Sequence, residues 1–263
     1  MTDLKDDAEK GWSSWGLRPI VLFAGVYMVV GIVHEFSHAI IAYGLGIPFT
    51  LLHLHVNLNR TIGTLNQRAI IGVAGPLIAL CIGLICWIAY IRARDSRFGM
   101  PLLYAAWFGA ATFFGNLIST AFVGDFSRLA MTLQWSNAVR YVVSVVGVLS
   151  ICGWSFLVGK ELREWAPNSV SAAKATVGMI AIPTVVGTTI VLLIFLPMPS
   201  TYAYGRIAES LFWIPAVIGA LTNQKDNMLR DYSSLVQSHH GQGRATDSIL
   251  EQTRTEQTSV TES

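Results

Sequence analysis

Charged residues are scarce in this sequence, and its long polar stretches lie almost entirely at its two ends. Asp, Glu, Lys and Arg make up only 13% of the 263 residues, against about 25% in a soluble domain. Hydrophobic residues make up 52% and occur in long uninterrupted blocks. This composition argues against an ordinary soluble domain and predicts a polytopic membrane protein.

A strong basic excess and paired cysteines are missing as well. The net charge is only +2 and the basic residues are scattered, so we expect no nucleic-acid partner and look for partners in the lipid bilayer. The three cysteines, Cys81, Cys86 and Cys152, lie in apolar blocks without the paired spacing of a zinc ribbon or redox motif. We expect them to be small residues of the core.

Six apolar blocks could cross a bilayer, each as a helix. A helix needs about 20 residues to span a hydrocarbon core of about 30 Å, and only the sixth block is short. We therefore predict an all-α fold of about six transmembrane helices, in a multi-pass protein of a prokaryotic-type cell membrane. The blocks are Pro19–Gly46, Ala69–Ile91, Pro101–Val123, Ala138–Val158, Ala175–Leu196 and Ile207–Leu221.

The two ends of the chain differ from this apolar middle. Residues 1–18 mix acidic and basic residues with Trp12 and Trp15, which is typical of an interfacial segment rather than of a cleavable signal peptide. Residues 19–221 form the predicted transmembrane domain. Residues 222–263 are rich in Ser, Thr, Gln and charge, so we expect a disordered polar tail.

A strand is predicted between the first two blocks. From Leu52 to Asn59 apolar residues alternate strictly with His and Asn, which indicates one arm of a membrane-associated β-hairpin that returns through Ile62–Leu65. An edge strand of this kind could pair with an extended peptide. A polar connector with one face on lipid or protein explains the pattern equally well.

The first block contains His34-Glu35-Phe36-Ser37-His38, the pattern His-Glu-x-x-His. Residues four apart share a helix face, so His34 and His38 can hold one metal ion with Glu35 beside it. Zn²⁺ suits imidazole ligands, and Glu35 would serve as the general base of a hydrolase. Ionisable groups at membrane depth cost roughly 2.5 to 3.5 kcal/mol each, so the cluster needs a reason. The alternatives are a polar patch between helices and a chance match.

A catalytic zinc site needs a third protein ligand. Between Phe36 and Lys160 the only carboxylates are Asp95, in a basic loop, and Asp125, after the third block. The first and third blocks must cross the membrane in the same direction, which brings Asp125 toward the depth of His38. An ordinary carboxylate that pairs with Arg128 is the alternative.

The remaining histidines are weaker candidates for a metal site. His53 and His55 share a face of the predicted strand and could bind a metal, but a polar strand face explains them without one. His239 and His240 lie in the polar tail, where we expect them to be solvated.

Together these residues resemble the site-2 protease family of intramembrane zinc metalloproteases. The resemblance covers roughly Ile20 to Arg128. It rests on His34–His38 in a transmembrane helix, a strand-bearing connector, Ala74-Gly75-Pro76-Leu77 opening the next helix, and Asn116 with Asp125 at the end of a third.

The resemblance implies a zinc metalloendopeptidase that cleaves a membrane protein substrate in or near a transmembrane segment. By position, it implies zinc ligands His34, His38 and Asp125 and a catalytic Glu35. It also implies that the connector receives an unwound substrate segment, with substrate-binding roles for Leu54, Val56, Asn57 and Asn116.

The sequence departs from the family pattern at three places. Ala79 stands where the family commonly has Asn, Ser119 stands in place of a Pro, and Gly124-Asp125-Phe126 replaces Leu-Asp-Gly. These departures motivate the alternative of a catalytically inactive relative that binds transmembrane partners or a metal. Counted over alternate loops, Lys and Arg are more numerous on the side of the membrane that holds the N-terminus, which predicts a cytoplasmic N-terminus. The family usually runs its catalytic helix the other way, so both orientations stay open.

Overall fold

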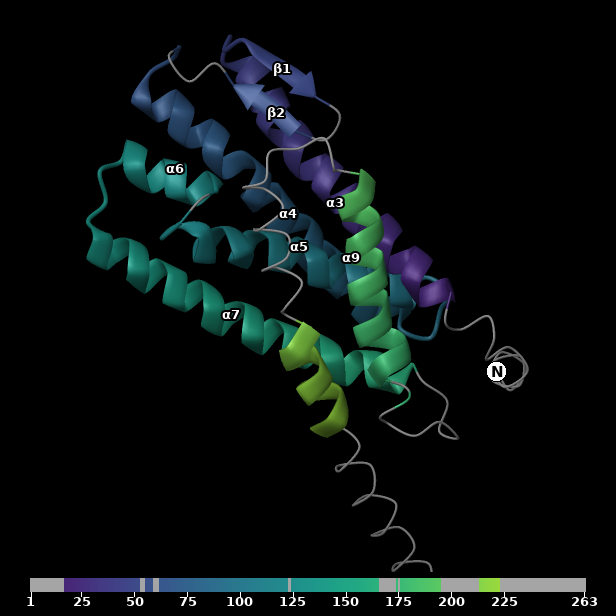
Figure 1. The fold of residues 1–263 in the computed structure, drawn as a ribbon. Helices are drawn as coiled ribbons and strands as arrows, with labels where there is room; N and C mark the ends of the chain where they lie inside the picture. Colours follow the sequence, from purple (N-terminus) through teal and green to yellow (C-terminus); the bar gives the residue numbers. More distant parts are fainter. Residues whose placement is uncertain are drawn as a thin grey trace, which may run out of the picture. The chain divides into compact units, whose positions relative to one another are not determined.

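The structure is a computed structural model, and it describes residues 17–52, 55–58, 62–122, 124–165, 174, 176–194 and 213–222. Helices dominate these residues, and one small antiparallel sheet accompanies them (Figure 1). The elements are α3 (Leu17–Gly44), β1 (Phe49–Leu52), β2 (His55–Leu58), α4 (Leu65–Ala93), α5 (Gly99–Ser119), α6 (Asp125–Thr132), α7 (Asn137–Glu164), η1 (Val177–Ala181) and α9 (Ile182–Ile194), followed by a short helix over Trp213–Thr222.

Four helices, α3, α4, α5 and α7, are long and apolar enough to cross a membrane. The mainly helical fold is thus confirmed, and four of the six predicted spans are helices of sufficient length and apolarity. In the described residues the fifth and sixth blocks form the shorter apolar helices Val177–Val191 and Trp213–Thr222. The fifth begins with the π-helical turn η1, and the sixth has only two to three turns of regular helix.

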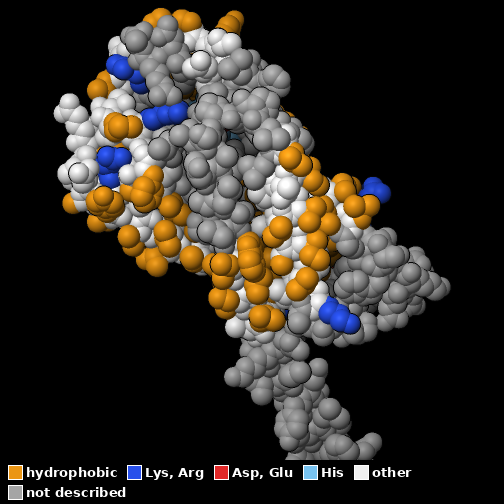
Figure 2. Space-filling model, viewed as in Figure 1, with side chains coloured by type: hydrophobic (Ala, Val, Ile, Leu, Met, Phe, Trp, Pro, Cys, Tyr) orange, Lys and Arg blue, Asp and Glu red, His pale blue; other side chains and the backbone are white. Residues whose placement is uncertain are grey.

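The outer surface of these helices is strongly apolar. On α7, the side chains of Tyr141, Val142, Val145 and Leu149 are all exposed. Figure 2 shows hydrophobic side chains spread across the described surface of one face, with few Lys or Arg and no visible Asp or Glu. An exposed apolar surface of this kind is expected of a protein surrounded by lipid.

Small residues let the central helices α4 and α5 pack closely. A Cβ atom on Gly83 would lie 3.1 Å from the carbonyl oxygen of Ala106, and one on Gly109 would meet the backbone of Ala79. Close backbone approach through small residues is the usual means of helix association in membranes. Ala79, where the family commonly has Asn, is fully buried at this contact.

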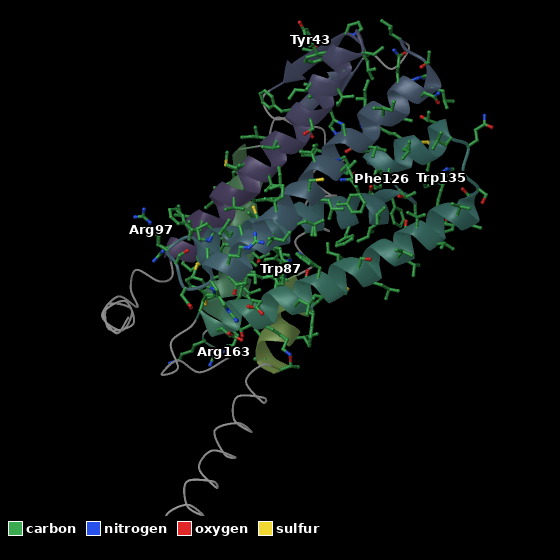
Figure 3. The ribbon with its side chains drawn as sticks, turned by 180° about the vertical axis from the view of Figure 1, so that it is seen from behind. Tyr43, Trp87, Arg97, Phe126, Trp135 and Arg163 are labelled. Carbon is green, nitrogen blue, oxygen red and sulfur yellow. The ribbon has the colours of Figure 1, made fainter. Side chains whose placement is uncertain are left out.

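The helices bring the ends of distant segments together. Tyr43, near the end of α3, and Trp135, just before α7, lie toward one end of the molecule, whereas Arg97 and Arg163 lie toward the other (Figure 3). The C-terminal ends of α3 and α5 therefore share one end of the bundle, as the order of the apolar blocks predicted. The β-hairpin lies beside the C-terminal part of α3 at that end (Figure 1).

The predicted hairpin exists, but its two strands lie at other positions in the sequence than predicted. β1 pairs with β2 in antiparallel register, with Thr50 opposite Asn57 and Leu51 opposite Val56. The chain therefore reverses between Leu52 and His55, inside the segment predicted as one strand, and Ile62–Leu65 is no second arm. Thr64 instead forms a capping box with Gln67 and begins α4. His53 and Leu54 lie outside the described residues.

Candidate metal centre

His34 and His38 lie one turn apart on α3, on the face that packs into the bundle. Both side chains are buried, at 4% and 5% relative exposure. Their rings meet edge to face with centroids 4.8 Å apart. The i, i+4 spacing accounts for this geometry, because the helix itself stacks the two imidazoles.

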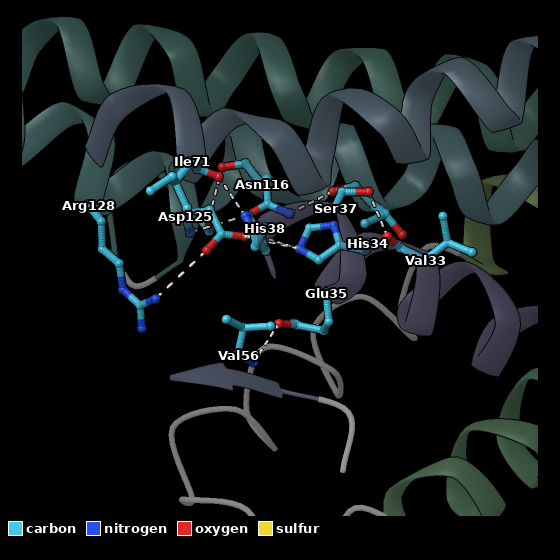
Figure 4. Close-up of polar contacts among 12 residues, drawn as sticks. Val33, His34, Glu35, Ser37, His38, Val56, Ile71, Asn116, Asp125 and Arg128 are labelled. Carbon is cyan, nitrogen blue, oxygen red and sulfur yellow. Dashed lines mark hydrogen bonds and ion pairs between the residues drawn. The ribbon is translucent and has the colours of Figure 1, made fainter. Parts of the chain in front are cut away.

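Asp125 brings a carboxylate to the same point from 91 positions further along the chain. Its Oδ2 atom lies 3.1 Å from Nε2 of His34 and 3.4 Å from Nε2 of His38. The two Nε2 atoms are 3.2 Å apart. Figure 4 shows the three side chains converging between α3, α4 and the start of α6.

These three separations match the edges of a zinc coordination sphere. Zn–N bonds of 2.0 to 2.1 Å at tetrahedral angles place neighbouring ligand atoms about 3.3 Å apart. The two Nε2 atoms and Oδ2 all carry lone pairs, so at these distances they repel one another unless a proton or a cation lies between them. His34, His38 and Asp125 thus form a group that could hold a metal ion, and its nitrogen and oxygen donors are of the kind that Zn²⁺ takes.

A backbone carbonyl orients the second imidazole toward this point. Nδ1 of His38 donates to the carbonyl oxygen of Ile71 on α4 at 2.6 Å. Since a carbonyl only accepts, the proton sits on Nδ1 and the Nε2 lone pair is free for a metal. Nδ1 of His34 is buried and has no hydrogen-bond partner within the described part of the chain.

Gly75 has no side chain, and this leaves space for the two imidazoles beside α4. It lies inside α4 rather than at the opening of that helix, next to Pro76. A Cβ atom at this position would lie against Nε2 of His38 and only 2.8 and 2.9 Å from the Cε1 atoms of His38 and His34. Any side chain here would fill the space of the candidate ion.

One expectation about the third block was wrong, as the short connector between α5 and α6 shows. Helix α5 ends at Ser119, and Asp125 is the first residue of the separate helix α6 rather than the end of the long one. Gly124 has φ +156°, and a Cβ atom there would lie 2.9 Å from Cβ of Ser119. Glycine therefore allows the chain to fold back on the end of α5.

Asn116, in the last turn of α5, forms a hydrogen bond with the first residue of α6. Its Oδ1 accepts a hydrogen bond from the backbone N–H of Asp125 at 3.3 Å, and its Nδ2 donates to the carbonyl of Thr112. In this structure its amide contacts the backbone of Asp125, and the predicted substrate-binding role of Asn116 stays a prediction.

The two carboxylate oxygens of Asp125 face different partners. Oδ2 faces the Nε2 atoms of both imidazoles. The other carboxylate oxygen, Oδ1, lies 3.8 Å from Nη1 of Arg128. The two interpretations of Asp125, metal ligand and partner of Arg128, are thus compatible, with one oxygen for each.

Glu35 lies beside this centre and contacts the hairpin. Its Oε2 accepts a hydrogen bond from the backbone N–H of Val56 at 3.1 Å (Figure 4). The side chain of Val56 is buried, whereas that of Asn57 is exposed. The side chain of His55 lies outside the described set, so its alternative metal role stays a prediction.

The sequence did not point to several groups that lie next to the candidate metal centre. The Gly75 position and the Ile71 carbonyl carry no chemical motif of their own, although Gly75 stands in the Ala-Gly-Pro element. The contacts of Arg140 with the α5–α6 connector were also missed, because α7 showed no motif.

Comparisons of the chain with protein-family models, with curated proteins and with solved structures found no match.

Proposed function

We propose that this protein is an intramembrane zinc metalloendopeptidase, similar to the site-2 proteases, that hydrolyses a peptide bond in or near a transmembrane segment of a membrane protein substrate. The observation that carries the proposal is the convergence of His34, His38 and Asp125 at separations of 3.1 to 3.4 Å. The order His-Glu-x-x-His places a carboxylate, Glu35, beside that point.

In this proposal the residues divide the chemistry between them. His34, His38 and Asp125 would hold the ion, which supplies Lewis acidity that polarises a carbonyl and eases deprotonation of water. Glu35 would accept the proton from the attacking water and deliver it to the amine that leaves. One water is consumed for each peptide bond broken, and Glu35 returns to its ionised form.

The hairpin would present the substrate to Glu35. In an antiparallel pair, successive residues point their N–H groups alternately toward the partner strand and away from it. The N–H of Val56 points away from β1, to Glu35. An extended substrate segment that adds to this edge of β2 at Val56 would therefore lie next to the general base, and the roles of Leu54 and Asn57 in binding it stay predictions.

The position of the motif in α3 supports cleavage at membrane depth. Helix α3 has 28 residues, about 42 Å at 1.5 Å per residue. His38 lies six residues and His34 ten residues before its end at Gly44, or about 9 to 15 Å from that end. If α3 spans the bilayer of a multi-pass protein, the centre lies inside it.

The test uses the purified full-length protein in detergent or proteoliposomes. Solubilised membrane proteins would be incubated with wild-type protein and with Glu35→Gln, and newly formed amino termini would be labelled and sequenced. We expect new termini within or beside transmembrane segments with the wild type only, while both proteins retain zinc. Zinc binding without any Glu35-dependent termini would favour the inactive, partner-binding relative.

A further inference from the structure

The C-terminal end of α5 carries carbonyl groups that its own helix cannot satisfy. The last four carbonyls of any helix lack intrahelical partners. Water is scarce at membrane depth, so protein groups must satisfy them. No glycine ends α5, whose last residue is Ser119 and whose cap is Thr120.

The N–H groups of Thr120 and Phe122 satisfy two of these carbonyls, those of Leu117 and Ser119. Helix α7 supplies partners for another and for the carbonyls that follow α5. Nε of Arg140 donates to the carbonyl of Thr120 at 3.0 Å, and Nη2 donates to the carbonyl of Ala121 at 3.4 Å. Oγ of Ser144 donates to the carbonyl of Ile118 at 2.8 Å and accepts from the N–H of Ala121 at 3.1 Å. A cation suits this place, since the C-terminal end of a helix carries partial negative charge.

The same guanidinium reaches the other side of the connector. Nη2 of Arg140 also contacts Oγ of Ser127, at 3.3 Å, in the first turn of α6. Ser127 is fully buried and donates to the carbonyl of Phe122. Arg140 therefore contacts the chain both before and after Asp125, at Ala121 and at Ser127. Within the described residues it forms no ion pair with Asp or Glu.

We propose that Arg140 is a positioning residue for the third metal ligand, and that α7 is part of the metal centre although it contributes no ligand. The inference rests on the proposed zinc site. One side chain fixes both ends of the short connector, so the position of Asp125 relative to α3 depends on α7. Arginine is suited to this task because its planar fork presents several donors in fixed directions.

The test measures zinc affinity of the full-length protein by competition with a chromogenic chelator. Arg140→Met keeps the aliphatic stem but removes the donors, and Arg140→Lys keeps one charged donor group. The control is Arg94→Met, because Arg94 binds Glu161 and Glu164 near the opposite end of α7. We expect Arg140→Met to weaken zinc binding about 10- to 100-fold, Arg140→Lys to be intermediate, and Arg94→Met to match the wild type.

A double-mutant cycle separates positioning from general stability. If Arg140 acts through Asp125, then Arg140→Met should weaken zinc binding in the wild-type background but add nothing in the Asp125→Ala background. Ser144→Ala offers a milder second variant if Arg140→Met does not fold, with a smaller loss of zinc affinity expected. Wild-type zinc affinity in Arg140→Met, or in Ser144→Ala where that variant is needed, would overturn the inference while leaving the zinc site intact. Absence of zinc from the wild-type protein would overturn both.

Discussion

The carboxylate of Glu35 on α3 accepts a hydrogen bond from the backbone N–H of Val56 on β2, at 3.1 Å. The proposed general base and the proposed substrate-binding strand are thus directly joined. A substrate segment that pairs with this edge of β2 would compete with Glu35 for the same N–H group. The Glu35–Val56 contact therefore connects strand addition to the carboxylate proposed as the general base.

This contact predicts that two substitutions of Glu35 have different effects on the hairpin. Glu35→Gln keeps an oxygen acceptor for Val56, whereas Glu35→Ala leaves the N–H of Val56 without that partner. Loss of the partner should lower the free energy of local opening of β2 by about 1 to 3 kcal/mol. Amide hydrogen exchange of peptides that cover residues 55–58 measures this difference.

Zinc content serves as the control in that experiment, because neither substitution removes a metal ligand. Equal exchange of β2 in Glu35→Ala and Glu35→Gln would contradict the role of the hydrogen bond.

Gly75 predicts a sharp loss of metal binding upon the smallest possible substitution. A methyl group at Gly75 would lie against both imidazoles, with Cε1 of His34 at 2.9 Å. Gly72→Ala, one turn earlier on α4, is the matched control, since its Cβ would meet no atom closer than 3.9 Å. We expect Gly75→Ala to lose most of its zinc and Gly72→Ala to keep it, as measured by elemental analysis of the purified proteins. The same zinc content in both variants would argue against the assigned position of the ion.

The short helix over Trp213–Thr222 is predicted to depend on a glycine of α7. A Cβ atom on Gly159 would lie 2.8 Å from Cα of Ala216 and against its carbonyl. Overpacking of this kind costs about 1 to 3 kcal/mol. Gly159→Ala should therefore lower the temperature of thermal unfolding in detergent.

Gly153→Ala is the control for this pair, because it lies on the same helix and its Cβ would have no neighbour within 4 Å. If both alanine variants unfold at the wild-type temperature, the short helix does not pack on α7 as described.

Much of the candidate centre could be predicted from the sequence because helical spacing is local. The four-residue interval between His34 and His38 fixes their common face, and the scarcity of acids left Asp125 as the main candidate for a third ligand. Their proximity at 3.1 to 3.4 Å agrees with that hypothesis. The long apolar blocks likewise predicted α3, α4, α5 and α7.

The rest depended on tertiary contacts that a sequence pattern does not encode. The alternation from Leu52 to Asn59 is equally compatible with one long strand and with two short ones, so the turn of the hairpin was misplaced. The capping box of Thr64 and Gln67 marks the start of α4 and argues against a second arm there. The contacts of Arg140 could not be predicted, since they join backbone carbonyls 19 and 20 positions away.

The most direct test of the account is the zinc content of the purified full-length protein, measured per chain for the wild type and four variants. We predict one zinc per chain in the wild type and in Glu35→Gln, and a large loss in His34→Ala, His38→Ala and Asp125→Ala. That result would establish the three ligands independently of any substrate. A wild-type protein without zinc, or zinc retained in all three ligand variants, would contradict the central claim.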